Sequence, residues 1–448
     1  MTQDTIAAIA TPPGRGGIGV IRISGSLAPA IAKQLTGELP DSRVATFTRF
    51  TDASSEALDE GILIYFAAPA SFTGEEVVEI QGHGGPVIQD MLLRRIVELG
   101  AQLAKPGEFS ERAFINGKLD LAQAEAVADL IESGSEQAAR SALHSLQGAF
   151  SKEIHTLVEM LTRLRMYVEA AIDFPEEEID FLADSRVKQE LEEIEKQFDQ
   201  LLAATRQGCL LHDGMTVVLA GKPNAGKSSL LNALAGQESA IVSDVPGTTR
   251  DIIREHIQID GLPIHVLDTA GLRESGDAVE SEGVRRAQAA MNRADRVLLV
   301  VDDNETTDDE LEKLITELPF GGPRTIVRNK IDLSNKKPSY INTRCFKEIS
   351  VSAKTGAGLD DLRQHLKDCM GYQSAGEGTF MARRRHLDAI ERALAHVTEG
   401  KKQLEETKAG ELLAEELRLA QNDLGEITGE VTSDDLLGKI FSTFCIGK

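Results

Sequence analysis

The 448-residue sequence lacks three features: a membrane-spanning segment, a secretion signal, and cysteines spaced to bind a metal ion or form disulfides. No apolar run approaches the ~20 residues that a membrane-spanning helix needs, so we expect no membrane segment. The first residues, MTQDTIAAIATPP, carry no basic stretch, so we expect no signal peptide. The four cysteines (Cys209, Cys345, Cys369 and Cys445) lie far apart, without the spacing of a metal site or a disulfide framework. Such cysteine usage is typical of the reducing cytoplasm, where we expect this protein to be.

Net positive charge is also missing. Asp and Glu number 72 against 48 Lys and Arg, which gives a formal net charge of −24. A protein that binds nucleic acid on its own usually has a basic surface. If this chain handles RNA, it needs a local basic patch, such as Arg383–Arg385, or a partner protein.

The order of sequence patterns predicts several domains, since the chain is too long for one ordinary core. Residues 1–118 contain short β-branched or alternating runs at 18–23, 61–66 and 76–81, which predict a β-rich domain. Apolar residues then recur at helical intervals in 119–212, and again in 374–448. Between these two helical segments lies an α/β segment, 213–373. The simplest architecture is a helical domain with the α/β segment inserted into it.

Local signals refine the helical segment. Asp120 and Gln123 have the spacing of a capping box at a helix start. A later helix is expected from Ser185 to Arg206, with Gly208 as its C-terminal cap. The interrupting run Asp173–Asp180 is rich in carboxylates and contains a proline, which favours a solvated loop over a metal site.

The α/β segment predicts a mostly parallel sheet. Asp260-Gly261 marks a hairpin between two of its strands. The expected strands are 215–220, 252–259, 264–267, 296–302, 325–328 and 348–352.

Two glycine clusters near the N-terminus need separate interpretation. Gly14, Gly16 and Gly19 match G-x-G-x-x-G, but a strand pattern follows instead of the helix that a dinucleotide site requires. We therefore reject a Rossmann site. Gly82–Gly85, which includes His83, is interpreted as a turn.

The strongest chemical signal is Gly221–Ser229, GKPNAGKSS, which fits the phosphate-binding pattern G-x-x-x-x-G-K-[ST]. An apolar strand pattern precedes it and a helix pattern follows it. Backbone N–H groups of such a loop point at a phosphate, and the helix N-terminus adds a favourable field. Lys227 would reach the β- and γ-phosphates, and the Ser228 hydroxyl would hold Mg²⁺.

Three further motifs follow in the order of G proteins. Asp268–Gly271 is D-x-x-G, whose aspartate would bind Mg²⁺ through water. Asn329–Asp332 is N-K-x-D, whose last carboxylate would accept two hydrogen bonds from guanine, a pair that adenine cannot offer. Ser352–Lys354, SAK, would lie behind the guanine O6. The expected GTP-binding residues are Asn224, Ala225, Gly226, Lys227, Ser228, Ser229, Ser243, Asp244, Val245, Pro246, Gly247, Thr248, Thr249, Asp268, Thr269, Ala270, Gly271, Asn329, Lys330, Asp332, Ser352, Ala353 and Lys354.

The two switch segments leave choices open. Thr249 is our choice to close the Mg²⁺ shell, and Thr248 is its rival. Leu272 stands where Ras-type proteins have a water-orienting glutamine, so another group must act. The candidate acids that follow are Glu274, Asp277, Glu280 and Glu282.

Together these motifs resemble one family along the whole chain. GKPNAGKSS, DVPGTTRD, DTAGLRE, NKID, SAK and the terminal CIGK are similar to the MnmE (TrmE) tRNA-modification GTPases, of the TrmE-Era-EngA-like, translation-factor-class GTPases. TPPGRGGIGVIRISG, SFTGEEVVEIQGHGG, GEFSERAF and KLDLAQAEA also look like that family. The resemblance implies a multidomain α/β and α fold: an N-terminal folate-binding-like domain that mediates homodimerisation, a two-segment helical domain and an inserted Ras-like G domain.

The resemblance also implies site residues that the spacing alone does not give. Arg22, Glu79, Lys118 and Lys448 would bind a formyl- or methylene-tetrahydrofolate. Glu280 would be the catalytic acid, beside Lys227 as the other catalytic residue. If Glu280 does not act, Glu282 is our next choice. A potassium ion would lie against Asn224, Ser243, Val245 and Thr248. Cys445 is either a site thiol, which the resemblance favours, or a buried structural one.

The resemblance implies the function as well. With an FAD-carrying partner of the MnmG type, the family adds an aminomethyl or carboxymethylaminomethyl group to wobble uridines of certain tRNAs. Two rival functions are a ribosome-assembly GTPase and a GTP-dependent assembly switch. The first would need an RNA-binding module, and none is legible in this sequence.

Overall fold

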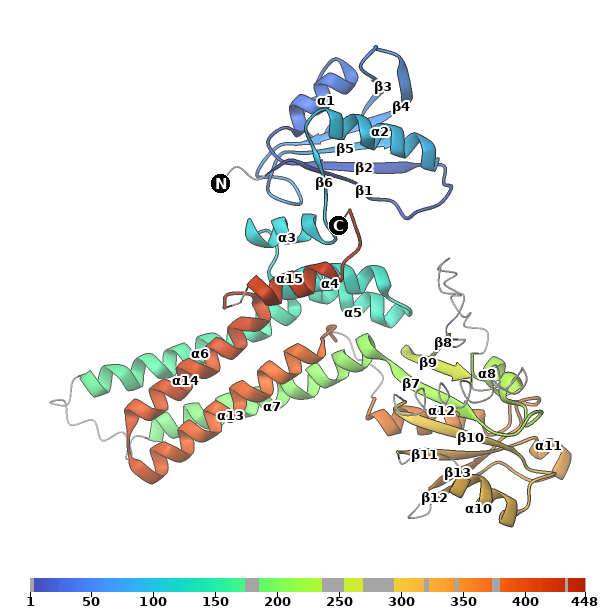
Figure 1. The fold of residues 1–448 in the computed structure, drawn as a ribbon. Coiled ribbons are helices and arrows are strands. Elements are labelled where there is room, and N and C mark those ends of the chain that lie inside the picture. Colours follow the sequence, from blue (N-terminus) through green and yellow to red (C-terminus); the bar gives the residue numbers. More distant parts are fainter. Residues whose placement is uncertain are drawn as a thin grey trace. The chain divides into compact units, whose positions relative to one another are not determined.

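The computed structural model describes residues 4–173, 185–235, 254–268, 294–317, 322–342, 346–372, 379–431 and 434–447 (Figure 1). The chain forms two compact units, each assembled from separate stretches of sequence. One contains residues 1–128, 145–195 and 389–448, and the other contains 129–144 and 196–388. Residues 129–144 therefore belong with the α/β unit, although their sequence pattern is that of the helical segment. The predicted domain limits stay predictions.

The N-terminal part of the first unit is a six-stranded sheet in the order β3-β4-β5-β2-β1-β6. All neighbouring strands are antiparallel except β1 and β6. Its core joins Ile21, Ile80 and Leu63 of the sheet to Ile31 and Leu92 of the helices. The elements are β1 (Ile6–Ile9), β2 (Gly19–Ser24), α1 (Ala28–Thr36), β3 (Thr46–Thr51), β4 (Ala57–Phe66), β5 (Val77–Gly82), α2 (Pro86–Glu98), β6 (Gln102–Leu103) and α3 (Glu108–Ile115).

In each glycine cluster, at least one glycine is closely approached by a neighbouring residue. Gly19 begins strand β2, so rejecting a Rossmann helix was right. A Cβ atom on Gly19 would lie 1.7 Å from Nε2 of Gln89 in α2, and one on Gly84 would lie 2.6 Å from the Gly16 carbonyl oxygen. Gly82 ends β5, and residues 83–85 form a connection to α2 in which no turn is assigned.

Long helices complete the first unit, and segments from before and after the insertion pack together as predicted. Arg165 of α6 donates to Gln421 Oε1 of α14 at 2.6 Å, and Gln421 in turn donates to Thr162 Oγ1 at 2.6 Å. Buried Leu161 and Leu417 belong to these same two helices. The helices of the two helical segments are α4 (Leu121–Glu132), α5 (Glu136–Leu146), α6 (Ala149–Asp173), α7 (Ser185–Asp213), α13 (Arg384–Thr407), α14 (Gly410–Thr428) and α15 (Asp434–Ser442).

The predicted start of α4 is confirmed, and the predicted end of α7 is wrong. Asp120 N donates to Gln123 Oε1 at 3.0 Å, and Gln123 N donates to Asp120 Oδ1 at 2.8 Å, the two bonds of a capping box. Helix α7 continues through Gly208 to Asp213, and Gly214, with φ of +65°, follows its last residue. Gly208 has another reason to be glycine, because a Cβ there would lie 2.6 Å from the Phe380 carbonyl oxygen.

The second unit holds the predicted mostly parallel sheet, in the order β12-β13-β11-β10-β7-β9-β8. Only β8 and β12, at its two edges, are antiparallel to their neighbours. Asp260 and Gly261 both have positive φ and join β8 to β9, which confirms the hairpin. The elements are β7 (Met215–Ala220), α8 (Lys227–Ala235), β8 (Arg254–Ile259), β9 (Leu262–Asp268), β10 (Arg296–Asp302), α10 (Asp308–Glu317), β11 (Arg324–Asn329), α11 (Ile331–Ser334), β12 (Ser339–Asn342), β13 (Lys347–Ser350) and α12 (Leu359–Met370).

The acidic loop and the membrane-segment expectation can each be compared with the described residues. Asp173 is the last residue of α6, and residues 174–180 of the predicted acidic loop lie outside the described residues. Among the residues that the structure describes, no helix combines the length and the apolar character of a membrane span.

Candidate nucleotide and N-terminal sites

The phosphate-loop motif lies between β7 and α8, where its glycines are required by close contacts. Gly221 has φ of +142° and Gly226 has φ of +89°. A Cβ on Gly221 would lie 2.1 Å from the Val300 carbonyl oxygen, and one on Gly226 would lie 2.3 Å from Nδ2 of Asn329. Any larger side chain would therefore push the loop away from the neighbouring strand ends.

Lys227 is held over the phosphate loop by hydrogen bonds to the loop backbone. The residue is 7% exposed, and its Nζ donates to the carbonyl oxygens of Gly221 at 3.1 Å and Lys222 at 3.0 Å. It is also the first residue of α8, so positive charge and helix N-terminus coincide. The predicted ion ligands Asn224 and Ser228 are exposed beside it.

Asn329 connects three motifs that are distant in sequence. The residue is 1% exposed. Its Nδ2 donates to the Ala225 carbonyl oxygen of the phosphate loop at 3.1 Å, and its Oδ1 accepts the Ala353 N–H of the SAK motif at 3.0 Å. The structure therefore brings these motifs together at the carboxyl edge of the parallel strands, where α/β sheets bind ligands.

The carboxylate predicted to select guanine is also positioned by the SAK motif. Asp332 Oδ1 accepts a hydrogen bond from Ser352 Oγ at 2.7 Å, and Ser352 Oγ accepts the Thr355 N–H at 3.2 Å. Lys330, with φ of +68°, places its ammonium 2.7 Å from Asp302 Oδ2. Lys354 is exposed.

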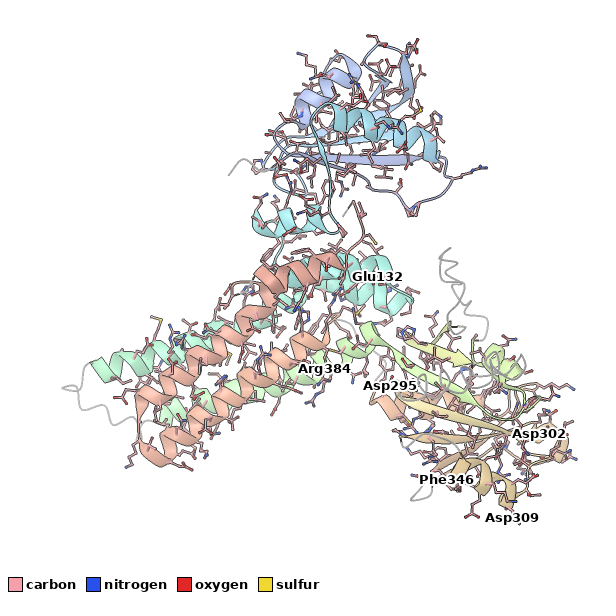
Figure 2. All side chains as sticks on the ribbon, in the orientation of Figure 1. Glu132, Asp295, Asp302, Asp309, Phe346 and Arg384 are labelled. Atoms are coloured by element: carbon pink, nitrogen blue, oxygen red, sulfur yellow. The ribbon has the colours of Figure 1, made fainter. Side chains whose placement is uncertain are left out.

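Sequence reasoning missed the two aspartates at the end of β10, one of which is labelled in Figure 2. The side chain of Asp303 is fully buried and accepts Ser334 Oγ at 2.5 Å and Lys336 Nζ at 2.9 Å. Burial opposes its ionisation, but these two hydrogen bonds outweigh it and lower the pKa of Asp303. The signal was present as two acids directly after an apolar strand.

Most of the predicted switch residues lie outside the described residues. Asp268 ends β9, and its backbone pairs with Leu219 of β7. The predicted site residues outside the described residues are Ser243, Asp244, Val245, Pro246, Gly247, Thr248, Thr249, Thr269, Ala270, Gly271, Glu280 and Lys448. The rival acids Glu274, Asp277 and Glu282 also lie outside.

In the N-terminal sheet, two of the predicted folate residues form an ion pair. Arg22 on β2 faces Glu79 on β5, with Nη2 2.8 Å and Nε 3.0 Å from Oε1. The Arg22 guanidinium also lies 5.5 Å from the Phe72 ring centroid. Lys118 donates to the Pro69 carbonyl oxygen at 3.1 Å. The loop between β4 and β5 therefore contacts both predicted cations.

A buried polar network beside this loop was not predicted. Arg112 is 5% exposed and pairs with Glu75 at 3.1 Å and Glu108 at 2.9 Å. Ser24 Oγ donates to Glu75 Oε2 at 2.7 Å. GEFSERAF contains both Glu108 and Arg112, but no pattern within it indicated a partner at position 75.

The C-terminal motif packs against the N-terminal sheet. A Cβ on Gly447, whose φ is +94°, would lie 2.6 Å from the Ile9 carbonyl oxygen, and Gly107 N donates to the Cys445 carbonyl oxygen at 3.4 Å. Cys445 is exposed, so the interpretation as a buried structural thiol is wrong. His83 is oriented by Asp59, with Nδ1 2.6 Å from Oδ1.

Comparison with known proteins identifies the family. The model of the MnmE helical domain matches residues 121–445, and that of the N-terminus of the GTP-binding protein TrmE matches residues 5–118. Proteins named tRNA modification GTPase MnmE are 58% identical in Pseudoalteromonas translucida, 59% in Hydrogenovibrio crunogenus and 58% in Vibrio cholerae. Each alignment covers 100% of this chain and 100%, 99% and 100% of the relative, respectively.

Two solved structures give partial matches, both with 27% identity and a TM-score of 0.27. One is the G domain of the T. maritima FeoB iron transporter, covering 35% of this chain and 98% of that chain. The other is an Aquifex aeolicus Era variant bound to GDP and aluminium fluoride, covering 41% and 66%. The fold assignment rests on the sheets described above and on the family models. This chain belongs to the MnmE (TrmE) family.

Proposed function

We propose that the protein is a GTP-hydrolysing enzyme of tRNA modification. The observation that carries this proposal is Asn329, which hydrogen-bonds both the phosphate loop and the SAK loop while Asp332 is held by Ser352. That constellation fits a guanine nucleotide, and relatives about 58% identical over the full chain are named tRNA modification GTPases.

In the reaction, this chain's groups stabilise charge and position water. Lys227 neutralises charge on the β- and γ-phosphates. Ser228 and Thr249 would hold Mg²⁺, which would supply further neutralisation. The exposed Ser228 hydroxyl at the start of α8 is the hard oxygen donor that Mg²⁺ prefers. Because Leu272 has no hydrogen-bonding group, Glu280 orients the attacking water, with Glu282 as the rival.

We further propose potassium activation through Asn224, Ser243, Val245 and Thr248. Among the described residues, the phosphate loop has a suitable neutral oxygen donor in Asn224, which is exposed and has φ of +63°. An arginine finger at the equivalent place in other GTPases accelerates hydrolysis by roughly 10³–10⁵-fold. A large, weakly hydrated cation bound by neutral oxygens would supply the same charge.

For the modification itself, we propose that the N-terminal domain binds a formyl- or methylene-tetrahydrofolate through Arg22, Glu79, Lys118 and Lys448. The folate would supply one carbon, and an MnmG-type FAD protein would complete an aminomethyl or carboxymethylaminomethyl group on wobble uridines. Arg22 beside Phe72 offers both a cation and an aromatic surface to a flat ligand with an acidic tail. The exposed thiol of Cys445 belongs to the same proposal.

We also propose that the chain acts as a cytoplasmic homodimer. Strand β3 is at an edge of the N-terminal sheet, and Phe47 on it is 73% exposed, opposite Ile62, which is 37% exposed. This apolar cross-strand pair on an edge supports association with a second copy. The dispersed cysteines support the cytoplasmic location.

One experiment tests the enzyme proposal. GTP turnover is measured at fixed ionic strength in potassium or sodium chloride for the wild type, Asn224→Ala and Glu280→Ala. We expect potassium stimulation in the wild type, its loss in Asn224→Ala, and a lower kcat with unchanged KM in Glu280→Ala.

A second experiment tests the role in tRNA modification. Wobble-uridine modification is measured in cells lacking the gene, with and without the wild-type chain. Intact modification in those cells would favour ribosome assembly or a pure switch.

A further inference from the structure

Three segments that are far apart in sequence meet at Asp129, a residue of α4 whose side chain is 4% exposed. Asp129 Oδ1 lies 2.5 Å from Nη2 of Arg383 and 3.3 Å from Nε2 of His212. His212 precedes the strand β7 by which the chain enters the α/β sheet, and Arg383 precedes α13, after the chain has left that sheet. We call Asp129, His212 and Arg383 the Asp129 clamp. Figure 2 labels Glu132, which is on the same helix as Asp129, and Arg384, which follows Arg383 in the chain.

His212 is held as a cation in this clamp. Burial opposes its charge, but hydrogen bonds to Asp129 and Asp213 outweigh that and raise the pKa of His212 to about 9. Its Nδ1 lies 2.7 Å from Asp213 Oδ1, and the Asp213 carbonyl oxygen lies 3.2 Å from Nε2 of His265. His265 is on β9, three residues before Asp268, so polar contacts continue from the clamp into the strand that ends at the predicted D-x-x-G motif.

A second contact holds the far end of the β8–β9 hairpin. Ser135, before α5, donates from Oγ to the Gly261 carbonyl oxygen at 2.9 Å and accepts the Ala138 N–H at 3.0 Å. The adjacent Asp260 receives Lys367 Nζ at 2.6 Å, and its carbonyl oxygen receives the Tyr372 hydroxyl at 3.3 Å. The hairpin turn is therefore tied to the start of α5 and to the end of α12.

The β8–β9 hairpin connects directly to both predicted switch segments. Strand β8 follows the predicted first-switch residues, and β9 ends where the second-switch motif begins. A paired hairpin is stiff along its strands, so a shift at the switch ends would reach its turn. Beside it lies a cavity of about 620 Å³, lined by Ile131, Ile257, Ile264 and Met381 among others, which leaves room for such a shift.

We propose that the Asp129 clamp and the Ser135 contact make residues 129–144 the output element of the G domain: the β8–β9 hairpin transmits the nucleotide state to α5, and the clamp transmits it to the ends of α7 and α13. This inference rests on the proposed GTPase function. A buried ion pair is weak evidence for stability, because desolvation offsets its attraction. What the pair provides is a defined arrangement of the three segments, which a two-state element needs if distant sites are to bias its equilibrium.

The test compares amide hydrogen exchange of the full-length protein with GDP and with GDP plus aluminium fluoride in potassium buffer. In the wild type, we expect exchange of residues 129–144 to differ between the two states. Asp129→Asn and Ser135→Ala should lose most of that difference while residues 215–235 keep theirs and kcat and KM for GTP stay unchanged. The matched control is Asp388→Asn, which removes the exposed i,i+4 pair with Arg384 in the same unit.

Each outcome is decisive. Retention of the full difference at 129–144 in both variants, or its absence in the wild type, overturns the proposal. Equal loss in Asp388→Asn would also overturn it, because any lost ion pair would then suffice. If Asp129→Asn does not fold, Ser135→Ala and Arg383→Lys provide the comparison. Failure of the wild type to hydrolyse GTP would contradict the proposed function instead, which separates the two claims.

Discussion

At the residue scale, Asp332 is the carboxylate that we propose selects guanine, and Ser352 Oγ orients it through a hydrogen bond of 2.7 Å. Asp332→Asn exchanges one acceptor for a donor, so guanine loses a match and xanthine gains one. We expect GTP binding to weaken by about 1.5–3 kcal/mol, the worth of a charged hydrogen bond, and xanthosine triphosphate to bind. Competition binding measures both. Asp360→Asn, on the exposed start of α12, is the control, and unchanged GTP affinity in Asp332→Asn would remove this residue from the base site.

His212 gives a prediction about pH. Its folded pKa is raised to about 9, above the usual value near 6.5, so its contribution to stability is complete below the unfolded pKa. That contribution is lost as pH rises through 9. Asp129 and Asp213 favour the charge, Arg383 opposes it, and His265 contacts the Asp213 backbone.

Denaturant unfolding of the wild type and His212→Gln between about pH 6 and pH 10 checks this expectation. The stability advantage of the wild type over the variant should shrink across that range. A constant difference would mean that His212 is not held charged in the folded state.

Side-chain hydrogen bonds could be predicted from the sequence where the partners lie within one local motif. They could not be predicted where the partners are far apart in the sequence. The capping box joins Asp120 and Gln123, only three positions apart, and was predicted correctly. The pairing of Arg112 with Glu75 and the binding of Lys336 to Asp303 join residues 37 and 33 positions apart. Nothing in either local pattern encodes which distant acid the fold will bring near.

At the scale of elements, Gly208 provides a test because helix propensity and packing oppose each other. Gly→Ala inside a helix normally stabilises by about 0.5–1 kcal/mol. At Gly208 a Cβ would lie 2.6 Å from the Phe380 carbonyl oxygen, so we expect Gly208→Ala to destabilise by about 1–3 kcal/mol, as overpacking does. Gly438→Ala in α15, where nothing lies within 4 Å, is the control and should be neutral or stabilising. Calorimetric melting compares them, and a stabilised Gly208→Ala would contradict the close packing.

Element prediction succeeded where a strand is a continuous apolar run. The strands at 215–220 and 296–302 were predicted with the bounds that the structure has, since both are buried on two faces of a parallel sheet. Strands β1, β3, β6 and β12 were missed. Strands β1, β6 and β12 have four residues or fewer, and β3 is an edge strand in which Phe50 alone is buried. In such strands, neighbouring strands rather than their own side chains decide the conformation.

At the scale of the whole molecule, the last residues of the chain pack against its N-terminal sheet. Periodicity could predict helices after residue 383, but not that their last residues reach strand β1. The structure places Gly447 against the Ile9 carbonyl oxygen and bonds the Cys445 carbonyl oxygen to Gly107 N. Phe441 and Phe444 pack edge to face, with ring centroids 5.3 Å apart, and are buried. Phe441 also lies 6.3 Å from Phe114 of α3 by ring centroids, so these rings anchor the C-terminal segment before its last four residues.

Because that anchor lies before Cys445, the terminal CIGK tetrapeptide can be removed without removing the helix that presents it. We expect deletion of residues 445–448 to lower reduced-folate affinity, since Lys448 is lost and the cover over the end of β1 goes with it. GTP turnover should be unchanged, because that site belongs to the other unit. Calorimetric titration of the full chain and the deletion with 5-formyltetrahydrofolate measures the first effect, and Lys448→Ala separates loss of charge from loss of cover. Equal folate affinity in the wild type and the deletion would show that the C-terminus packs there for structural reasons alone.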